Sequence, residues 1–323
     1  MNNHSEGFNV ANKTHKVLPN NKTISSHASS HGSIAAAHEN AVEFIDDLGA
    51  MEGYLTIIGG YGLIVTMGMC YGFSTMEGFH LLAIGMALVA IACFIILRLD
   101  TISYRYQPVL FNRHNKNIHV FIDEGITWWK IWQISPKSRI ETWNWSYARA
   151  EIVEFFVMTR TGIPHREYAL ICAITDPSES EKIICRFGVG MTSFYPEALS
   201  ERWEHVRRFM TEDGPHLAQG DSLFLDTSTH QIWAALTWGQ PLLGPGSKDF
   251  WTGNAINGWW FFTIPSGLFI LIFLPFTILG GLMRYASHFA KREPRWTSEI
   301  LAGIGRRLTK DEIVENMNRT SVR

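Results

Sequence analysis

Three long apolar stretches interrupt an otherwise polar chain. Two of them, residues 54–73 and 80–97, contain no Asp, Glu, Lys or Arg and are separated by the six residues 74–79. At a rise of 1.5 Å per residue, a helix of either length matches the ~30 Å hydrocarbon core of a bilayer. Backbone polar groups in lipid must be hydrogen-bonded within the spanning structure, so the pattern predicts a transmembrane helical hairpin over residues 54–99.

The third apolar stretch, residues 258–283, has a different pattern. It opens on an aromatic cluster that includes Trp259 and Trp260, contains Pro265 and Pro275, and ends at Arg284. Aromatic residues of this kind gather at membrane interfaces, and proline kinks a helix. We expect a third membrane segment here, either a kinked helix or a re-entrant segment that breaks near Pro265.

Small residues at four-residue spacing occur in both spans of the predicted hairpin. Gly68 and Gly72 form such a step in the first span, and Ala83 and Ala87 form another in the second. Faces of this kind let helix backbones approach closely. We therefore expect Gly68, Gly72, Ala83 and Ala87 to lie at helix contacts, within the chain or in a homo-oligomer.

The basic residues do not agree on one orientation. Arg98, Arg105 and Arg113 follow the second span, which places residues 100–250 in the cytoplasm by the positive-inside rule. Basic residues also follow the third segment, which would place the C-terminal tail there too. Three full spans cannot satisfy both, so either one flank departs from the rule or the third segment is re-entrant. We expect a multi-pass membrane protein with a cytoplasmic soluble domain.

The chain outside the membrane divides into four regions. Residues 1–38 are polar and predict a disordered tail, in which His27 and His31 do not predict a metal site because no helical pattern brings them together. Apolar residues at helical spacing predict an amphipathic helix over residues 39–53. Residues 100–250 predict a strand-rich soluble domain, and residues 284–323 a basic C-terminal tail.

Within the soluble domain, alternating patterns predict six or seven strands followed by one helix. The turn Arg113–Lys116 separates two strands, and Trp143 and Trp145 are expected on one face of a later strand. The helix is predicted over residues 196–211, where Leu199, Trp203, Val206 and Met210 form an apolar stripe and Arg202, His205 and Arg208 lie on the surface. This order of elements is that of a pleckstrin-homology-like barrel. Together with the predicted membrane helices, it makes the predicted fold class an α+β membrane protein.

Two residue pairs could carry chemistry. Glu201 and His205 lie four apart on the predicted helix, where a surface ion pair is the expected arrangement. Cys172 and Cys185 would lie opposite each other in a hairpin centred between Ser178 and Glu179. A disulfide between them is possible in an oxidising compartment, whereas two free thiols are expected in the cytoplasm.

Composition and motifs narrow the function. Charged residues make up 18% of the chain and the net charge is −2, which argues against a nucleic-acid-binding protein. The spans lack the ionisable residue that carriers of ions usually need, which disfavours a transporter subunit. The sequence carries no nucleophile-elbow, P-loop, zinc-protease or dinucleotide motif, so neither an enzyme nor a bound cofactor is predicted.

Three motifs carry a resemblance to a known family: Pro108–Arg113, the run Trp143-Asn144-Trp145, and the helix Trp203–Met210 with its sequence WEHVRRFM. Together they resemble an uncharacterised family of proteobacterial membrane proteins, often encoded near type VI secretion and polymorphic-toxin genes. The resemblance implies an immunity protein that neutralises a toxin at the inner membrane by stoichiometric binding. A scaffold or adaptor of secretion or envelope homeostasis is the alternative. We expect partner contacts around Trp128, Trp129, Arg207 and Arg208.

Overall fold

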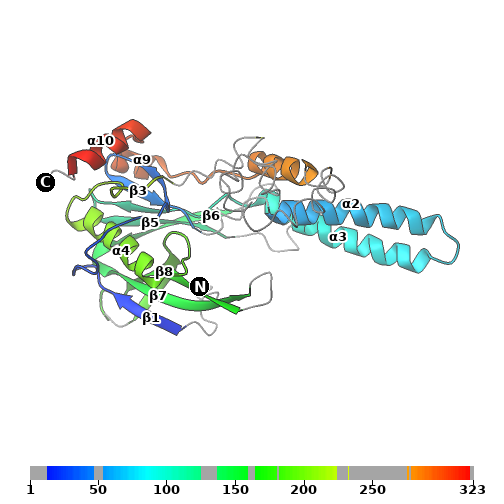
Figure 1. Cartoon of the computed structure of the whole chain (residues 1–323), viewed down its shortest axis with the longest axis horizontal. Coiled ribbons are helices and arrows are strands. Elements are labelled where there is room, and N and C mark those ends of the chain that lie inside the picture. Colours follow the sequence, from blue (N-terminus) through cyan, green and yellow to red (C-terminus); the bar gives the residue numbers. More distant parts are fainter. Residues whose placement is uncertain are drawn as a thin grey trace, which may run out of the picture.

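The computed structural model describes residues 13–46, 54–124, 137–158, 164–179, 182–223, 232, 275 and 278–320. They form a β-rich domain from which two long helices project at one end (Figure 1). A further helix at residues 278–290 lies between the domain and this hairpin. The other elements, in chain order, are β1 (Lys13–Leu18), β2 (Ile34–Ala37), β3 (Ala41–Phe44), α2 (Tyr54–Ser74), α3 (His80–Ile102), β4 (Val109–Asn112), β5 (Asn117–Asp123), β6 (Ser138–Asn144), η3 (Trp145–Tyr147), β7 (Ala148–Met158), β8 (Pro164–Thr175), β9 (Ile183–Gly188), α4 (Pro196–Thr211), α9 (Ser298–Ile304) and α10 (Lys310–Thr320).

Two antiparallel sheets build the domain. One has the strand order β2-β3-β4-β5-β6 and the other the order β1-β7-β8-β9. Helix α4 contacts strands of both sheets and lies at the end of the domain remote from the hairpin (Figure 1). Aromatic rings connect the layers: Phe44 packs on Phe111, Phe111 on Trp145, and Trp145 on Trp203 of α4, with centroids 5.6, 6.2 and 5.2 Å apart. One continuous core therefore joins both sheets and α4.

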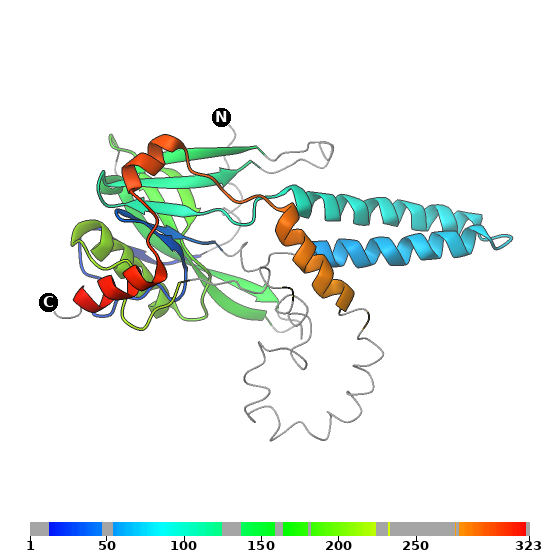
Figure 2. The same cartoon turned by 90° about the horizontal axis from the view of Figure 1, so that it is seen from above.

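The hairpin is an insertion between two neighbouring strands. β3 and β4 pair directly, with Ala41 opposite Asn112 and Phe44 opposite Val109. Helices α2 and α3 both lie between these strands in the sequence, run side by side and end in a tip far from the domain (Figures 1 and 2). The predicted helical hairpin over residues 54–99 is confirmed as a pair of helices.

The sides of the hairpin are apolar and open. Leu81 is 84% exposed, and Ile84, Leu88 and Ile91 continue the exposed apolar surface along α3. Only 22% of the most apolar stretch of α2 and 11% of that of α3 are buried. Among the described residues, these two helices are long and apolar enough to cross a membrane.

Glycines near the domain, together with Ala83 of the predicted small-residue steps, lie where the two helices approach each other. Ala83 is buried, and its carbonyl lies 3.4 Å from Sγ of Cys70 in α2. A Cβ atom added at Gly59 would lie 2.8 Å from the backbone nitrogen of Leu97, and one at Gly62 would lie 2.5 Å from Sγ of Cys93. A Cβ atom at Gly68 or Gly72 would meet no atom within 4 Å. The expected helix contact within the chain is therefore wrong for Gly68 and Gly72.

The N-terminal predictions are wrong where the structure describes the chain. Residues 13–38 are ordered, because β1 pairs with β7 and β2 pairs with β3. Residues 41–44, predicted as part of an amphipathic helix over 39–53, form strand β3, and residues 47–53 lie outside the described residues. Short apolar runs fit helix and strand alike, and here pairing with β4 decides the outcome.

The C-terminal region is also folded rather than a tail. Helices α9 and α10 pack on the domain, where Ile304 and Ile313 are buried. His38 and Arg307 form a β-bridge that joins this region to the N-terminal strands. Of the predicted third membrane segment, residues 258–274 lie outside the described residues, whereas residues 278–283 belong to helix 278–290.

In the β-rich domain, the strand hairpin around Arg113–Lys116 and the helix at 196–211 are confirmed. Trp145 lies in the short helix η3, so it does not share a strand face with Trp143. Cys172 lies opposite Phe187, because the hairpin turns later than predicted and a bulge between Ile174 and Thr175 shifts the register further. Cys172 and Cys185 both carry free thiols. Among the described residues, strands β4–β9 precede α4 in the predicted order, while the likeness to a pleckstrin-homology barrel stays a prediction.

Candidate partner-binding region at helix α4

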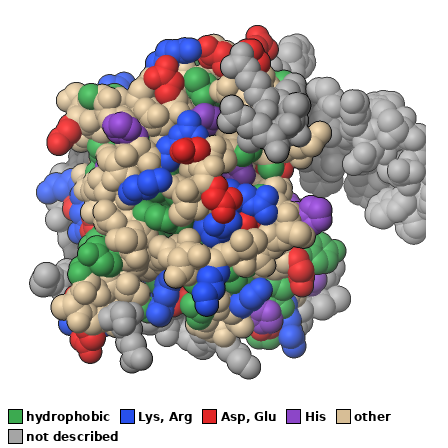
Figure 3. All heavy atoms as spheres, turned by 90° about the vertical axis from the view of Figure 1, so that its left-hand side faces the viewer, with side chains coloured by type: hydrophobic (Ala, Val, Ile, Leu, Met, Phe, Trp, Pro, Cys, Tyr) green, Lys and Arg blue, Asp and Glu red, His purple; other side chains and the backbone are tan. Residues whose placement is uncertain are grey.

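Helix α4, at the end of the domain away from the hairpin, carries two of the four predicted site residues, Arg207 and Arg208. Pro196 begins the helix, where a missing backbone N–H costs nothing. The predicted stripe of Leu199, Trp203, Val206 and Met210 is completely buried, as expected. The outer surface at this end shows Lys and Arg interspersed with Asp and Glu (Figure 3).

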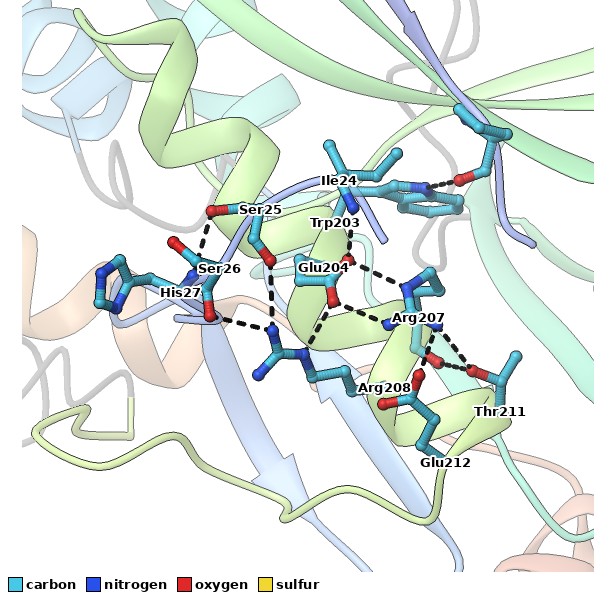
Figure 4. A network of polar contacts seen from close by, with 11 residues as sticks. Ile24, Ser25, Ser26, His27, Trp203, Glu204, Arg207, Arg208, Thr211 and Glu212 are labelled. Atoms are coloured by element: carbon cyan, nitrogen blue, oxygen red, sulfur yellow. Dashed lines mark hydrogen bonds and ion pairs between the residues drawn. The ribbon is translucent and has the colours of Figure 1, made fainter. Parts of the chain in front are cut away.

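The carboxylate of Glu204 is the centre of a buried polar network (Figure 4). It is completely buried and accepts hydrogen bonds from Nε and Nη2 of Arg207 at 2.9 and 2.7 Å, and from Nε of Arg208 at 2.7 Å. The backbone N–H of Ile24 donates a fourth bond at 3.0 Å. Arg207 also pairs with Glu212 at 2.8 Å. The adjacent arginines thus converge on one carboxylate.

These contacts set the charge states. Burial by itself would raise the pKa of Glu204, but the bonds from Arg207, Ile24 and Arg208 outweigh it and lower the pKa to about 2. The bonds to Glu204 raise the pKa of Arg207 above its usual value. Glu204 is therefore a permanent anion between two permanent cations, and it cannot act as a general base near neutral pH.

The same network holds residues 19–33, a segment between β1 and β2 that we call the N-terminal strap. Nη2 of Arg208 donates to the carbonyls of Ser25 and Ser26 at 3.2 and 3.0 Å, as Figure 4 shows. Nε1 of Trp203 donates to the carbonyl of Pro19 at 3.1 Å. A polar segment that the sequence gives no core of its own is thus ordered by hydrogen bonds from α4.

A second set of bonds fixes the distal part of the strap. Arg202 is 2% exposed and donates to the carbonyls of Ser30, Val189 and Met191. Gly190, at φ +75°, leaves room for this arginine, because a Cβ atom there would lie 2.9 Å from its Cδ. The surface position predicted for Arg202 is therefore wrong.

The predicted surface ion pair between Glu201 and His205 is also wrong. Glu201 pairs instead with His31 of the strap at 2.9 Å. His205 is buried, and its Nε2 lies 3.2 Å from the carbonyl of His216. Burial lowers the pKa of both His205 and His216 to about 4, so both imidazoles are neutral at physiological pH.

A second buried carboxylate lies at the root of the hairpin. Glu43 of β3 is 5% exposed and accepts a hydrogen bond from Nε1 of Trp296 at 3.0 Å. Burial raises the pKa of Glu43, and the bonds from Trp296 and Tyr106 partly oppose this. Tyr106 follows α3 and Trp296 follows helix 278–290. The Glu43 carboxylate therefore connects β3, which precedes the hairpin, with the segments after α3 and after helix 278–290.

A further buried carboxylate, that of Asp100, lies where α2, α3 and helix 278–290 meet. Its Oδ2 accepts bonds from the backbone N–H and the hydroxyl of Thr56 at 2.8 and 2.5 Å. Its Oδ1 lies 2.7 Å from Nζ of Lys291, and both side chains are less than a tenth exposed. The pair attaches the end of helix 278–290 to the base of the hairpin.

The predicted site residues have different outcomes. Trp128 and Trp129 lie outside the described residues. Arg207 is buried, while the side chain of Arg208 is 33% exposed. Across the part of the chain that the structure describes, no three His, Cys, Asp or Glu side chains gather in a way that could hold a metal ion. Contact of Arg207 and Arg208 with a partner stays a prediction.

The sequence analysis missed Glu204, although a signal for it was present. Glu204 precedes Arg207 by three residues and Arg208 by four, the two spacings at which side chains meet on a helix. Nothing in the sequence indicated Asp100–Lys291, whose partners lie 191 positions apart.

The fold and its buried networks define an α+β protein with a helical hairpin inserted into a sheet. The chain belongs to the family described as "Family of unknown function (DUF6708)", which it matches over residues 86–304. Neither the comparison with curated proteins nor that with solved structures finds a match. The expected resemblance to an uncharacterised family is thus confirmed, whereas its bacterial source and gene neighbourhood stay predictions.

Proposed function

We propose that the protein is a membrane-anchored binding protein. The observation that carries this proposal is the placement of two apolar helices, open along their sides, as an insertion between β3 and β4. Exposed apolar surface on this scale is unfavourable in water but matches the acyl chains of a bilayer. The opposite end of the domain carries mixed charges suited to water (Figure 3).

The basic flank of α3 supports a cytoplasmic domain. Arg98 and Arg105 lie at the base of the hairpin, next to Lys291 and Arg292 of the later chain. All four follow apolar segments and lie at the same end of the hairpin, as the positive-inside rule requires of a cytoplasmic face. The anchor would then place α4 and its strap in the cytoplasm, facing away from the inner membrane.

For the partner we propose a toxin that acts at the inner membrane, with the protein as its immunity protein. The support is the resemblance of the Trp203–Met210 motif to a family encoded near toxin genes. Stoichiometric binding needs a rigid surface and no catalytic group, and α4 with its strap is held by many bonds to buried charges. Arg208, partly exposed beside the strap, remains the residue we propose for partner contact.

The test is a competition between cells. A strain that lacks this gene and its immediate upstream neighbour is mixed, in contact, with its secreting parent. Immunity predicts that the parent kills this strain and that wild-type protein restores survival. Arg208→Ala should restore less survival than the control Arg149→Ala, whose side chain on β7 is similarly exposed. Survival of the deletion strain would overturn the immunity proposal and favour the adaptor.

A further inference from the structure

Helix 278–290 has its polar side inside and its apolar side outside. Arg284, Ser287 and His288 are at most 5% exposed, whereas Leu282 is 41% and Phe289 66% exposed. A helix on the surface of a water-soluble domain has the reverse arrangement. The exposed residues of this helix include Ile278, Leu282, Ala286 and Phe289, which recur at three- and four-residue spacing and form one stripe.

The helix lies beside the base of the hairpin rather than along its length. A Cβ atom at Gly60 of α2 would lie 2.6 Å from Sδ of Met283, and one at Gly280 would lie 2.9 Å from the hydroxyl of Tyr61. Figures 1 and 2 show that it crosses α2 near the domain and ends well short of the tip.

The depth of this contact follows from helix geometry. Gly60 and Tyr61 come six and seven residues after Tyr54, which is about 9–10 Å along the axis of α2. The midplane of the hydrocarbon core is ~15 Å from its surface. If the core begins near the start of α2, helix 278–290 stays within one leaflet.

Chain topology leads to the same placement. Residues 13–46, 103–223 and 298–320 all belong to one folded domain, since β1 pairs with β7 and Ile313 lies in the core beside them. The chain between residues 224 and 297 must therefore cross a membrane an even number of times. Its one strongly apolar stretch of spanning length, residues 258–283, is too short for two spans.

We propose that helix 278–290 is an interfacial element that lies in the leaflet next to the domain, with its apolar stripe toward the acyl chains, and that the chain after it lies on the same side of the membrane as strands β4–β9. This inference rests on the proposed hairpin anchor and extends the lipid-facing surface from α2 to a third helix. The continuity of the stripe with the open sides of the hairpin identifies lipid as its occupant. This placement also allows the basic residues after α3 and those after helix 278–290 to lie on the same, cytoplasmic side of the membrane.

The side of the membrane is tested with single cysteines in the full chain. The background carries Cys70→Ala, Cys93→Ala, Cys172→Ala and Cys185→Ala, checked for unchanged circular dichroism. Glu179→Cys reports on the middle of the domain and Glu299→Cys on the chain after the helix; both positions are exposed. In spheroplasts, a membrane-impermeant maleimide should give the same result at both positions. Labelling of only one would overturn the inference.

Depth is tested in phosphatidylethanolamine–phosphatidylglycerol liposomes with an NBD fluorophore on the same background. Leu282→Cys should lose fluorescence most with lipids brominated near the head group, and Leu88→Cys, midway along α3, with lipids brominated deep in the chain. Glu299→Cys is the matched aqueous control, quenched by iodide alone. Quenching at Leu88 but not at Leu282 would refute the interfacial helix and retain the anchor. If a second copy of the chain covers Leu282, quenching at Leu282 would return when the protein is diluted with lipid, and this result would also refute the interfacial helix. Loss of quenching at Leu88 would refute the anchor itself.

Discussion

Phe44 of β3 lies directly opposite Val109 of β4, although the whole α2–α3 hairpin separates them in the sequence. Both residues are buried in the core shared by the two sheets and α4. The two ends of the hairpin therefore lead, in the sequence, to adjacent strands of one sheet.

Removing the charge of Glu204 should destabilise the domain strongly. Glu204→Gln leaves Arg207 buried with only Glu212 as a counter-charge, and breaking a buried ion pair in this way costs about 3–5 kcal/mol. The midpoint of urea unfolding, followed by tryptophan fluorescence, measures the loss. Glu212→Gln, at a side chain that is 52% exposed, is the matched control and should cost less than about 1 kcal/mol.

The same variant should free the N-terminal strap before the domain unfolds. Arg208 reaches Ser25 and Ser26 from its position on Glu204, so loss of the carboxylate weakens both contacts. Limited proteolysis should then cut within residues 19–33 at protease levels that leave the wild-type protein intact. Equal cleavage of both proteins would show that the strap is held independently of Glu204.

Stability should fall as the pH drops below the ordinary range of histidine. Burial lowers the folded-state pKa of His205 and His216 to about 4, from 6.5 in the unfolded chain. As the pH falls, the unfolded state therefore binds protons before the folded state does. The free energy of unfolding is highest above pH 6.5 and falls between pH 6.5 and 4 by about 1.4 kcal/mol per pH unit for each histidine. Unfolding midpoints at several pH values give the slope.

A single substitution separates this effect from general acid sensitivity. His216→Gln should flatten the slope between pH 6.5 and 4, because one of the two protonation sites is gone. His114→Gln, at an exposed position, should leave the slope as in the wild-type protein. An unchanged slope in His216→Gln would exclude this imidazole as a cause. Below this range the loss of Glu204 stabilisation follows, since its pKa of about 2 lies under its ordinary value of 4.5.

Packing of the hairpin should depend on Gly59 but not on Gly68. A methyl group at Gly59 meets the backbone of Leu97, which cannot rotate away, so Gly59→Ala should cost about 1–3 kcal/mol. Gly68→Ala points into open space and should leave thermal stability unchanged in dilute detergent. If Gly68→Ala instead lowers the oligomeric state in detergent, Gly68 and Gly72 lie between copies of the chain.

Local patterns could be predicted from the sequence, and long-range ones could not. The two apolar helices were predictable from the length of their uncharged runs, and α4 was predictable from an apolar stripe at helical spacing. The ordered strap was not, because residues 19–33 are polar and their structure comes from Glu204 and Arg202 far along the chain. Polar composition indicates disorder only when no buried charge elsewhere supplies the missing bonds.

Asp100 and Lys291 give the most direct test of how helix 278–290 is attached to the hairpin. Asp100→Asn leaves Lys291 buried without its anion, and the expected cost is about 3–5 kcal/mol. The double variant Asp100→Asn with Lys291→Met removes both charges and should recover most of this loss, because burying an apolar side chain carries no charge to desolvate. Arg306→Gln, at the surface pair with Glu312, is the control and should not shift the melting temperature measurably. Melting temperatures in detergent measure all four proteins. A double variant that is no more stable than Asp100→Asn would show that the ion pair, rather than the relief of an isolated charge, holds the helix in place.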